Sequence, residues 1–304
     1  MKEQSEKISG LQLWQWRQAA IKAAIATDIS AGEVDWLLEE VAGLDRLAIL
    51  LGSFKNWQEI ELKLPLTKLE KLWQERIENR MPVQYIAGNT TWRNFNLKVS
   101  PAVLIPRPET ESLIDLAVQA TEKYPQLRRG DWADLGTGSG AIALGLADAF
   151  EDANIHAVDC SPEALAIARA NAFTHQFTEK IKFYQGCWWE PLSHLKGKFS
   201  GMVSNPPYIP TDVIPTLQSE VKNHEPHLAL DGGMSGLTYI SHLINISCEY
   251  LAPRGILLLE MMAGQDDLVE SLLGNQGGYC NIEIHSDLSG IRRFALAYKK
   301  YISS

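Results

Sequence analysis

The chain has 304 residues, of which 45% are hydrophobic and 21% are charged; these proportions are typical of a folded protein and argue against extensive disorder. Its formal net charge is −9, which argues against a protein that binds nucleic acid mainly by neutralising phosphates. The length allows either two comparable domains or one large domain with an appendage.

Cysteine and histidine spacing gives no sign of a metal site or of a disulfide framework. The four cysteines include no C-x-x-C pair, and the seven histidines form no cluster with ligand spacing. We therefore predict no metal and a reducing compartment. The first ten residues are too polar for a signal peptide, and the apolar runs are too short to span a bilayer. We expect a cytoplasmic protein that does not associate with membranes and acts as a monomer.

The N-terminal part of the chain has a helical pattern. Apolar residues recur at three- and four-residue spacing from Leu11 to about Arg80, which predicts several amphipathic helices. Ser30 and Glu33 have the spacing of a capping box, in which each side chain binds the backbone N–H of the other residue. We predict that residues 1–85 form a small all-α domain of four or five helices.

Short runs of β-forming residues follow. These runs are Tyr85-Ile86, Thr90 to Trp92 and Phe95 to Val99. Gly88 and Asn94 separate them and favour turns. We therefore predict a β-hairpin linker over residues 86–106.

After Pro108, short apolar runs alternate with longer helical patterns. The predicted strands cover residues 132–135, 155–158, 181–184, 201–204 and 256–260, with weaker candidates at 281–285 and 294–298. This alternation predicts a parallel sheet with helices on both faces. Residues 107–304 should therefore form one doubly wound, Rossmann-like α/β domain with seven strands.

A glycine-rich loop joins the first of these strands to the apolar helix predicted at 141–150. The loop reads Gly136-Thr137-Gly138-Ser139-Gly140. Glycines at alternate positions let a ligand approach the backbone, and the loop ends at a helix N-terminus. Because the spacing is GxGxG rather than GxGxxG and no P-loop lysine is near, a phosphate-bearing cofactor is disfavoured. The alternative is a tight strand-to-helix turn without a ligand.

Asp159 ends the next predicted strand, where its carboxylate could accept hydrogen bonds from both ribose hydroxyls of an adenosine. The alternative role is the N-cap of the following helix, although Ser161 could fill that position with Pro162 behind it. The glycine loop, the acidic residue and the lack of phosphate ligands together point to S-adenosylmethionine. Its sulfonium is a cation, which suits acidic surroundings.

The sequence Asn205-Pro206-Pro207-Tyr208 directly follows the predicted strand 201–204. Two successive prolines remove two backbone donors and fix φ, so the carbonyl groups here are free to accept hydrogen bonds. A planar NH2 group could donate to the Asn205 side-chain oxygen and to the Pro206 carbonyl, with Tyr208 covering its flat face. Such a nitrogen is a weak nucleophile, so the site would act by orientation and polarisation. The turn indicates an amino-group methyltransferase but not its substrate, and the alternative is a plain strand-ending loop.

These motifs resemble those of the protein-(glutamine-N5) methyltransferases of the PrmC/HemK family, which modify the Gly-Gly-Gln loop of peptide-chain release factors. The resemblance covers nearly the whole chain, including Leu104 to Glu111, the glycine loop, Asn205 to Tyr208 and Glu225 to Gly233. It implies a class I methyltransferase domain that transfers a methyl group from S-adenosylmethionine to the glutamine side-chain nitrogen and leaves S-adenosylhomocysteine. It also implies that the helical domain docks the release factor.

The resemblance assigns the site residues as well. The implied cofactor contacts are Gly136, Thr137, Gly138, Ser139, Gly140, Asp159, Trp188 and Asn205. The implied catalytic residues, which would hold the glutamine amide, are Asn205, Pro206, Pro207 and Tyr208. Without the resemblance, Trp188 could equally belong to the domain core together with Trp189. Arg107, Glu109 and Glu111 could line the substrate entrance or be ordinary surface charges.

Two other functions stay open at this point. One is an adenine-N6 methyltransferase acting on nucleic acid, which usually carries a basic recognition region that this chain lacks. The other is a non-catalytic adaptor whose helices bind a translation factor. Asn205→Ala separates an enzyme from the adaptor, because an enzyme should lose methylation while it retains partner binding, whereas an adaptor should lose nothing measurable.

Overall fold

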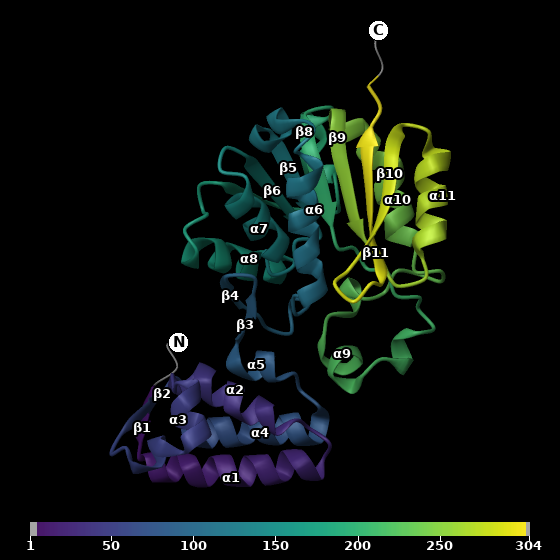
Figure 1. The fold of residues 1–304 in the computed structure, drawn as a ribbon. Coiled ribbons are helices and arrows are strands. Elements are labelled where there is room, and N and C mark those ends of the chain that lie inside the picture. Colours follow the sequence, from purple (N-terminus) through teal and green to yellow (C-terminus); the bar gives the residue numbers. More distant parts are fainter. Residues whose placement is uncertain (1–4, 302–304) are drawn as a thin grey trace. The chain divides into compact units, whose positions relative to one another are not determined.

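The computed structural model describes residues 5–301, which fall into two compact units (Figure 1). The first unit contains the described residues up to Asn89 together with Gln218–His224. The second contains Thr90–Leu217 and the described residues from Glu225 onward. Within the described residues, no helix has both the length and the apolar character needed to cross a membrane.

The first unit is mainly helical, as predicted. Its helices are α1 (Gly10–Ala26), α2 (Ala31–Ala42), α3 (Arg46–Leu51), the 3-10 helix η1 (Ser53–Asn56), α4 (Leu66–Asn79), α5 (Val83–Ala87) and α9 (Ser219–His224). The prediction of β structure at Tyr85-Ile86 is wrong, because both residues lie in α5. The all-α prediction is also wrong in one detail, since β1 (Glu6–Ile8) pairs antiparallel with β2 (Ile60–Leu62).

The predicted capping box at the start of α2 is only half formed. The Ser30 hydroxyl accepts a hydrogen bond from the Gly32 backbone N–H at 3.2 Å and so caps the helix. The Glu33 carboxylate turns away and binds the Arg76 guanidinium, with Nε at 2.7 Å. A buried guanidinium requires a counter-charge, and this long-range demand outweighs the local capping contact.

Arg76 is 5% exposed and binds two carboxylates, those of Glu33 and Glu220. We expect Arg76→Ala to lower the free energy of unfolding by about 2 kcal/mol, because Glu33 then loses its counter-charge and Glu220 keeps only the longer pair with Arg80, at 3.9 Å. The loss stays below that of a fully buried pair because both carboxylates are about a quarter exposed and can hydrate. Urea denaturation measures it.

The matched control is Arg17→Ala, because among the described residues of this unit Arg17 binds only Asp35, whose side chain is 34% exposed. We expect this change to cost about 1 kcal/mol, as partly exposed pairs do. Equal losses of unfolding free energy in the two variants would contradict the larger stabilising role that we assign to Arg76 and its two carboxylates.

The second unit begins with the predicted hairpin and contains a seven-stranded sheet in the described part of the chain. The hairpin pairs β3 (Asn89–Trp92) with β4 (Phe95–Lys98). The sheet strands are β5 (Asp131–Leu135), β6 (Asn154–Asp159), β7 (Ile181–Gln185), β8 (Phe199–Ser204), β9 (Leu251–Glu260), β10 (Tyr279–Ser286) and β11 (Arg292–Lys299). Their order is β10-β11-β9-β8-β5-β6-β7, which confirms the seven predicted strands.

The prediction of a wholly parallel sheet is wrong for one strand, β11, which is second in the sheet order. β11 runs antiparallel to both of its neighbours, β9 and β10. Only residues 287–291 connect β10 to β11, and a connection this short allows antiparallel pairing but no parallel crossover. The five strands that carry the predicted motifs remain parallel to one another.

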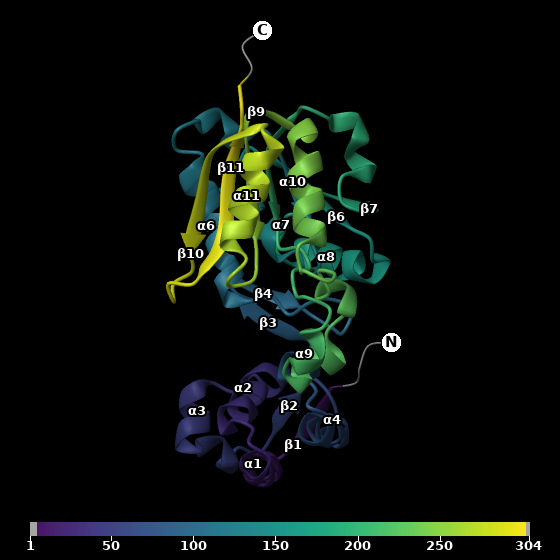
Figure 2. The same ribbon diagram turned by 90° about the vertical axis from the view of Figure 1, so that its right-hand side faces the viewer.

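Helices cover both faces of this sheet (Figure 2). They are α6 (Ser112–Ala120), α7 (Ala141–Ala149), α8 (Pro162–Thr174), α10 (Thr238–Tyr250) and α11 (Asp266–Gln276), with 3-10 helices η2 (Pro108–Glu111), η3 (Pro125–Arg129), η4 (Glu190–Leu195), η5 (Ile214–Thr216) and η6 (His227–Ala229). Along β9, Ile256 and Leu258 pack into the cluster that includes α6 and α7, whereas Leu257 and Leu259 pack with α10 and α11. The carboxyl ends of β5, β6, β8 and β9 therefore meet at one edge, where such folds bind ligands.

Candidate active site

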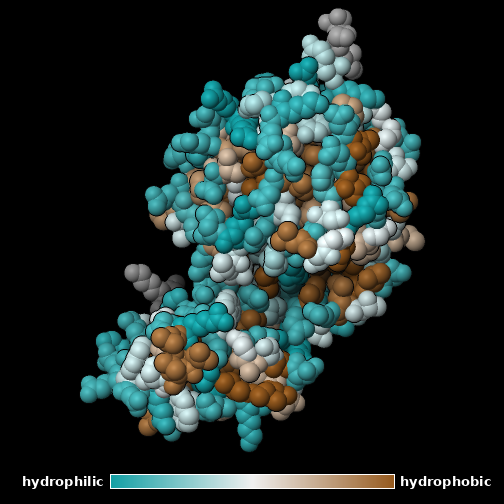
Figure 3. All heavy atoms as spheres, in the orientation of Figure 1, coloured by the Kyte–Doolittle hydropathy of each residue, from teal (hydrophilic) through white to brown (hydrophobic). Residues whose placement is uncertain are grey.

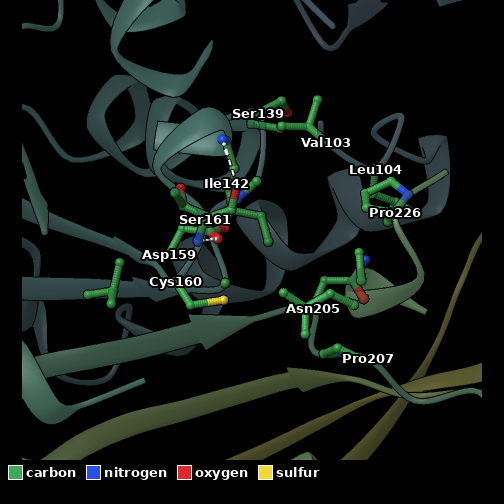
Figure 4. Close-up of a pocket in the computed structure, with 18 of the residues that line it drawn as sticks. Val103, Leu104, Ser139, Ile142, Asp159, Cys160, Ser161, Asn205, Pro207 and Pro226 are labelled. Atoms are coloured by element: carbon green, nitrogen blue, oxygen red, sulfur yellow. Dashed lines mark hydrogen bonds between the residues drawn. The ribbon is translucent and has the colours of Figure 1, made fainter. Parts of the chain in front are cut away.

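A cavity of about 400 Å³ opens at this edge of the sheet (Figure 4). The predicted site residues that line it are Gly136, Thr137, Gly138, Ser139, Asp159, Trp188, Asn205 and Pro207. Figure 4 shows Asp159 on one side of the cavity and Asn205 with Pro207 on the other. Gly140, Pro206 and Tyr208 are not among the lining residues. The structure thus brings together most of the predicted residues around one space.

The glycine loop needs its glycines for backbone conformation. Gly136, Gly138 and Gly140 have φ values of 80°, 54° and 85°, in the left-handed region that favours glycine. A Cβ on Gly140 would also lie 3.2 Å from the Ala168 side chain. Gly140 therefore allows close packing at the start of α7, while the other two glycines shape the cavity wall.

Asp159 is bonded to the glycine loop. Its Oδ2 accepts a hydrogen bond from the Gly138 backbone N–H at 2.8 Å, and its Oδ1 accepts one from the Ser161 N–H at 2.9 Å. Ser161 itself caps α8 by accepting from the Ala164 N–H, so the N-cap alternative for Asp159 is wrong. Burial raises the pKa of Asp159, and these backbone donors oppose that rise. The backbone and side chain of Cys160 also hydrogen-bond to this carboxylate, which lines the cavity and can accept from a ligand hydroxyl there.

Asn171 supports the same loop, a role that the sequence pattern does not predict. It is buried on α8, and its Nδ2 donates to the Ser139 carbonyl at 2.8 Å and to the Lys98 carbonyl at 3.0 Å. Its Oδ1 accepts from the Lys98 N–H at 2.7 Å. One side chain thus ties the hairpin to the glycine loop. Its only sequence signal is an amide among the apolar residues of a helix.

The two adjacent tryptophans have different surroundings. Trp188 lines the cavity with a left-handed φ of 52°, an uncommon conformation for a bulky residue that often marks a functional site. Its ring lies beside Gly136 and 5.4 Å from the Tyr239 ring. Trp189 is 1% exposed, and its Nε1 donates to Ser247 Oγ at 2.8 Å. Only Trp189 belongs to the core.

Asn205 directly follows β8 and faces the cavity. Its Nδ2 donates to Thr110 Oγ1 at 3.2 Å, while its Oδ1 accepts no hydrogen bond from residues 5–301. Tyr208 points elsewhere: its hydroxyl donates to Glu260 at 3.2 Å, and its carbonyl accepts from Gln265 Nε2 at 3.0 Å. Tyr208 therefore anchors the turn, and Asn205 presents a free acceptor.

Among the charged residues of the 107–111 segment, only Arg107 lines the cavity. Its guanidinium binds the buried carboxylate of Glu225 at 2.7 Å. Glu111 instead accepts a hydrogen bond from the Arg93 N–H at 2.9 Å. Arg107 is therefore neutralised by a partner, so no described residue gives the cavity a free cation aimed at a phosphate.

The chain is similar to several curated proteins over nearly its full length. It is 50% identical to a release factor glutamine methyltransferase from Synechocystis sp., over 95% of this chain and 97% of that protein. It is 47% identical to one from Thermosynechococcus vestitus, over 93% and 96%. The chain belongs to the release factor glutamine methyltransferase family. Residues 114–235 also match the family model for the methyltransferase small domain.

Membership of the release factor glutamine methyltransferase family makes the protein a methyltransferase with S-adenosylmethionine as methyl donor. The fold agrees with this. The hMettl16 catalytic domain, solved in complex with the MAT2A 3′UTR hairpin 6, superposes with a TM-score of 0.54 at 16% identity, over 68% of this chain and 76% of that chain. This likeness concerns the fold alone.

The residues of the cavity fit S-adenosylmethionine. The volume lies in the range of small-ligand sites. The glycine loop presents backbone without side chains, Asp159 offers an acidic acceptor for hydroxyls, and the Trp188 ring offers a flat apolar surface. The acidic character and the paired state of Arg107 suit a cationic ligand without phosphate.

Asp134 lies beneath the glycine loop and is fully buried. Its Oδ2 accepts hydrogen bonds from Thr137 Oγ1 at 2.5 Å and from the Ala143 N–H at 2.9 Å, whereas its Oδ1 has no partner among the described residues. Burial raises the pKa of Asp134 from 3.8 to about 7, although both hydrogen bonds oppose the rise. Its ionisation is therefore coupled to folding.

We expect Asp134→Asn to change how stability depends on pH. Because the pKa is raised in the folded state, the contribution of Asp134 to stability is full below its unfolded value and is lost as the pH rises through about 7. The isosteric amide removes this loss, which amounts to at most about 1.4 kcal/mol per pH unit. Urea denaturation of both proteins at about pH 5 and pH 7 measures it. If the unfolding free energy changed equally between the two pH values in the wild type and in Asp134→Asn, the raised pKa assigned to Asp134 would be contradicted.

Proposed function

We propose that the protein transfers the methyl group of S-adenosylmethionine to the side-chain amide nitrogen, N5, of the glutamine in the Gly-Gly-Gln loop of a peptide-chain release factor. This reaction would support translation termination in the cytoplasm. The observation that carries the proposal is the free Oδ1 of Asn205, which faces the same cavity as the glycine loop and Asp159. Family membership supports the choice of substrate.

The chain's own residues orient the glutamine amide. A primary amide carries two N–H groups. We assign their acceptors to Asn205 Oδ1, which lies in the cavity wall, and to the carbonyl oxygen of Pro206, which follows Asn205 in the chain and is not itself a lining residue. When bound, S-adenosylmethionine supplies a methyl group made electrophilic by its sulfonium. Fixing both N–H groups places the nitrogen and polarises it, which is the main help that a weak nucleophile needs. The nitrogen gains the methyl group and then releases one proton to solvent, so no strong base is required.

The opposite side of the cavity would hold the cofactor and its product, S-adenosylhomocysteine. Asp159 accepts from the ribose hydroxyls while its backbone partners, Gly138 and Ser161, keep the carboxylate in place. Trp188 packs against the adenine, and Gly136 leaves room beside it. The residue types, their places around the cavity and family membership support these assignments.

We assign docking of the release factor to the helical unit. This unit exposes large apolar side chains, and Figure 3 shows hydrophobic side chains gathered on its surface. Three of them are neighbours on α3: Leu47, Leu50 and Leu51 are 62%, 78% and 69% exposed. Exposed apolar groups that are close together are typical of a protein-binding surface.

Labelled S-adenosylmethionine tests the proposed function directly. The protein is incubated with release factor whose Gly-Gly-Gln glutamine is intact or replaced by alanine. We expect label only in the release factor that keeps its Gly-Gly-Gln glutamine. Equal label in both proteins, or label in neither, would overturn the proposal. A parallel incubation with DNA or RNA tests the adenine-methyltransferase alternative, which predicts label in the nucleic acid instead.

A further inference from the structure

Behind Asn205 lies a chain of buried hydrogen bonds that the reaction described above does not use. Thr110 Oγ1 donates to Glu260 Oε2 at 2.7 Å, and the Tyr208 hydroxyl donates to Glu260 Oε1 at 3.2 Å. Thr110 is 4% exposed and Glu260 is 0% exposed. Ser204 and Leu259 are opposite each other in the neighbouring strands β8 and β9. Asn205 and Glu260 each come next in the chain, so they lie side by side at the carboxyl ends of these strands.

Counting hydrogens shows what this network does. The Thr110 hydroxyl has one hydrogen, and an ionised Glu260 can only accept, so that hydrogen is committed to Glu260. The Thr110 oxygen can then only accept from its other neighbour, Asn205. An amide turned the other way would place Asn205 Oδ1 against the Thr110 oxygen, two acceptors with no hydrogen between them. The network therefore permits a single orientation of the Asn205 amide.

We propose that Thr110 and Glu260 are positioning residues that hold the Asn205 amide with its oxygen toward the substrate. The proposal rests on the proposed function, because it explains why a primary amide, which donates two N–H groups, meets an acceptor and not a donor. Neither residue needs to touch the reacting nitrogen. Thr110 acts on Asn205, and Glu260 acts through Thr110.

Protonation of Glu260 would release this constraint. The groups that face its carboxyl are Thr110, Tyr208, Glu109 and Arg293. Arg293 is itself bonded to Asp287 at 2.7 Å. Burial is the main cause that raises the pKa of Glu260 to about 7. A protonated Glu260 can donate to Thr110, whose own hydrogen is then free to bind Asn205 Oδ1, so the amide can turn. Methyl transfer should therefore slow as the pH falls below about 7.

The first test removes the hydroxyl of Thr110. We expect Thr110→Val to lower kcat for release factor methylation about 10- to 100-fold while KM for the release factor changes less than about twofold, because orientation and not docking is lost. Thr110→Ser retains the hydroxyl and should recover most of kcat. The control is Thr121→Val, because Thr121 is also buried and its hydroxyl donates to the Val118 carbonyl and accepts from Arg128 Nε, both away from the cavity. A Thr110→Val kcat equal to that of the control would overturn the proposal.

The second test uses pH. Wild-type kcat should fall about tenfold from pH 8 to pH 6, whereas Glu260→Gln cannot ionise and should change less than about twofold. The same profile in both proteins would overturn the proposal. Folding of each variant is checked by its circular dichroism spectrum and by its affinity for S-adenosylmethionine.

A readout without turnover separates this proposal from the proposed function. In protein labelled with ¹⁵N-asparagine, the side-chain signals of Asn205 are identified by their loss in Asn205→Ala. We expect them to shift as the pH passes about 7 in the wild type but not in Glu260→Gln or Thr110→Val. Signals that do not shift in the wild type would overturn the proposal, whether or not the release factor is methylated. Methylation by the wild type reports on the proposed function alone.

Discussion

Replacing Asn205 by alanine is expected to lower kcat for release factor methylation at least about a hundredfold. The change removes the oxygen that faces the cavity without a protein partner. The glutamine amide then keeps at most one acceptor, at Pro206, and its nitrogen is free to rotate away from the methyl donor. The measurement is single-turnover transfer of labelled methyl groups at saturating cofactor.

Binding of the release factor should survive this change, since we assign docking to the helical unit. Asn275→Ala serves as the matched control, because Asn275 is exposed on α11 and bonds only Ser271 in the described part of the chain. A non-catalytic adaptor predicts equal behaviour of the two variants. Wild-type kcat in Asn205→Ala would therefore contradict the assignment of this residue.

Replacing Asp159 by alanine is expected to weaken S-adenosylmethionine binding about a hundredfold. The Gly138 and Ser161 N–H groups lose their acceptor, so the glycine loop loses one attachment to the end of β6 and keeps the bonds of the Gly136 and Thr137 N–H groups to the Val158 carbonyl. The ribose hydroxyls lose the same carboxylate. Hydrogen bonds to charged groups contribute about 1.5–3 kcal/mol each, and about 1.4 kcal/mol is tenfold in affinity. Isothermal titration calorimetry measures the change.

The control for Asp159 is Asp152→Ala. Asp152 lies on the surface and pairs only with the exposed Arg129 among the described residues, so its loss should leave cofactor affinity within about twofold of the wild type. If Asp159→Ala bound the cofactor as tightly as this control, Asp159 would have no part in the cofactor site.

Local sequence pattern was sufficient for the strands that carry the site. β5 and β6 are short apolar runs followed by a turn and a helix, and β8 is one followed by the Asn205 to Tyr208 turn, so the predicted bounds of all three agree with the structure to within two residues. The predicted strand begins at Ile256 and not at Leu251, the start of β9, because Pro253 and Arg254 interrupt the apolar run before Gly255. The antiparallel edge depends on which strands β11 joins, and periodicity carries no information about that choice.

What the sequence did not reveal depends on contacts between distant residues. Ile8 pairs with Ile60 in strands of three residues, too short to show alternation. Glu33 looks like a capping residue until Arg76 is placed beside it. Thr110 and Glu260 are 150 positions apart, so no local motif joins them, although an acidic residue at the carboxyl end of a buried strand is a usable signal.

The central claim is that the glutamine side chain of a release factor receives the methyl group. Tandem mass spectrometry of release factor incubated with the protein and S-adenosylmethionine tests this claim most directly. We predict a single added methyl group, located on the glutamine of the Gly-Gly-Gln loop and absent with Asn205→Ala. A release factor that stays unmodified, or that carries the methyl group on another residue, would contradict the claim.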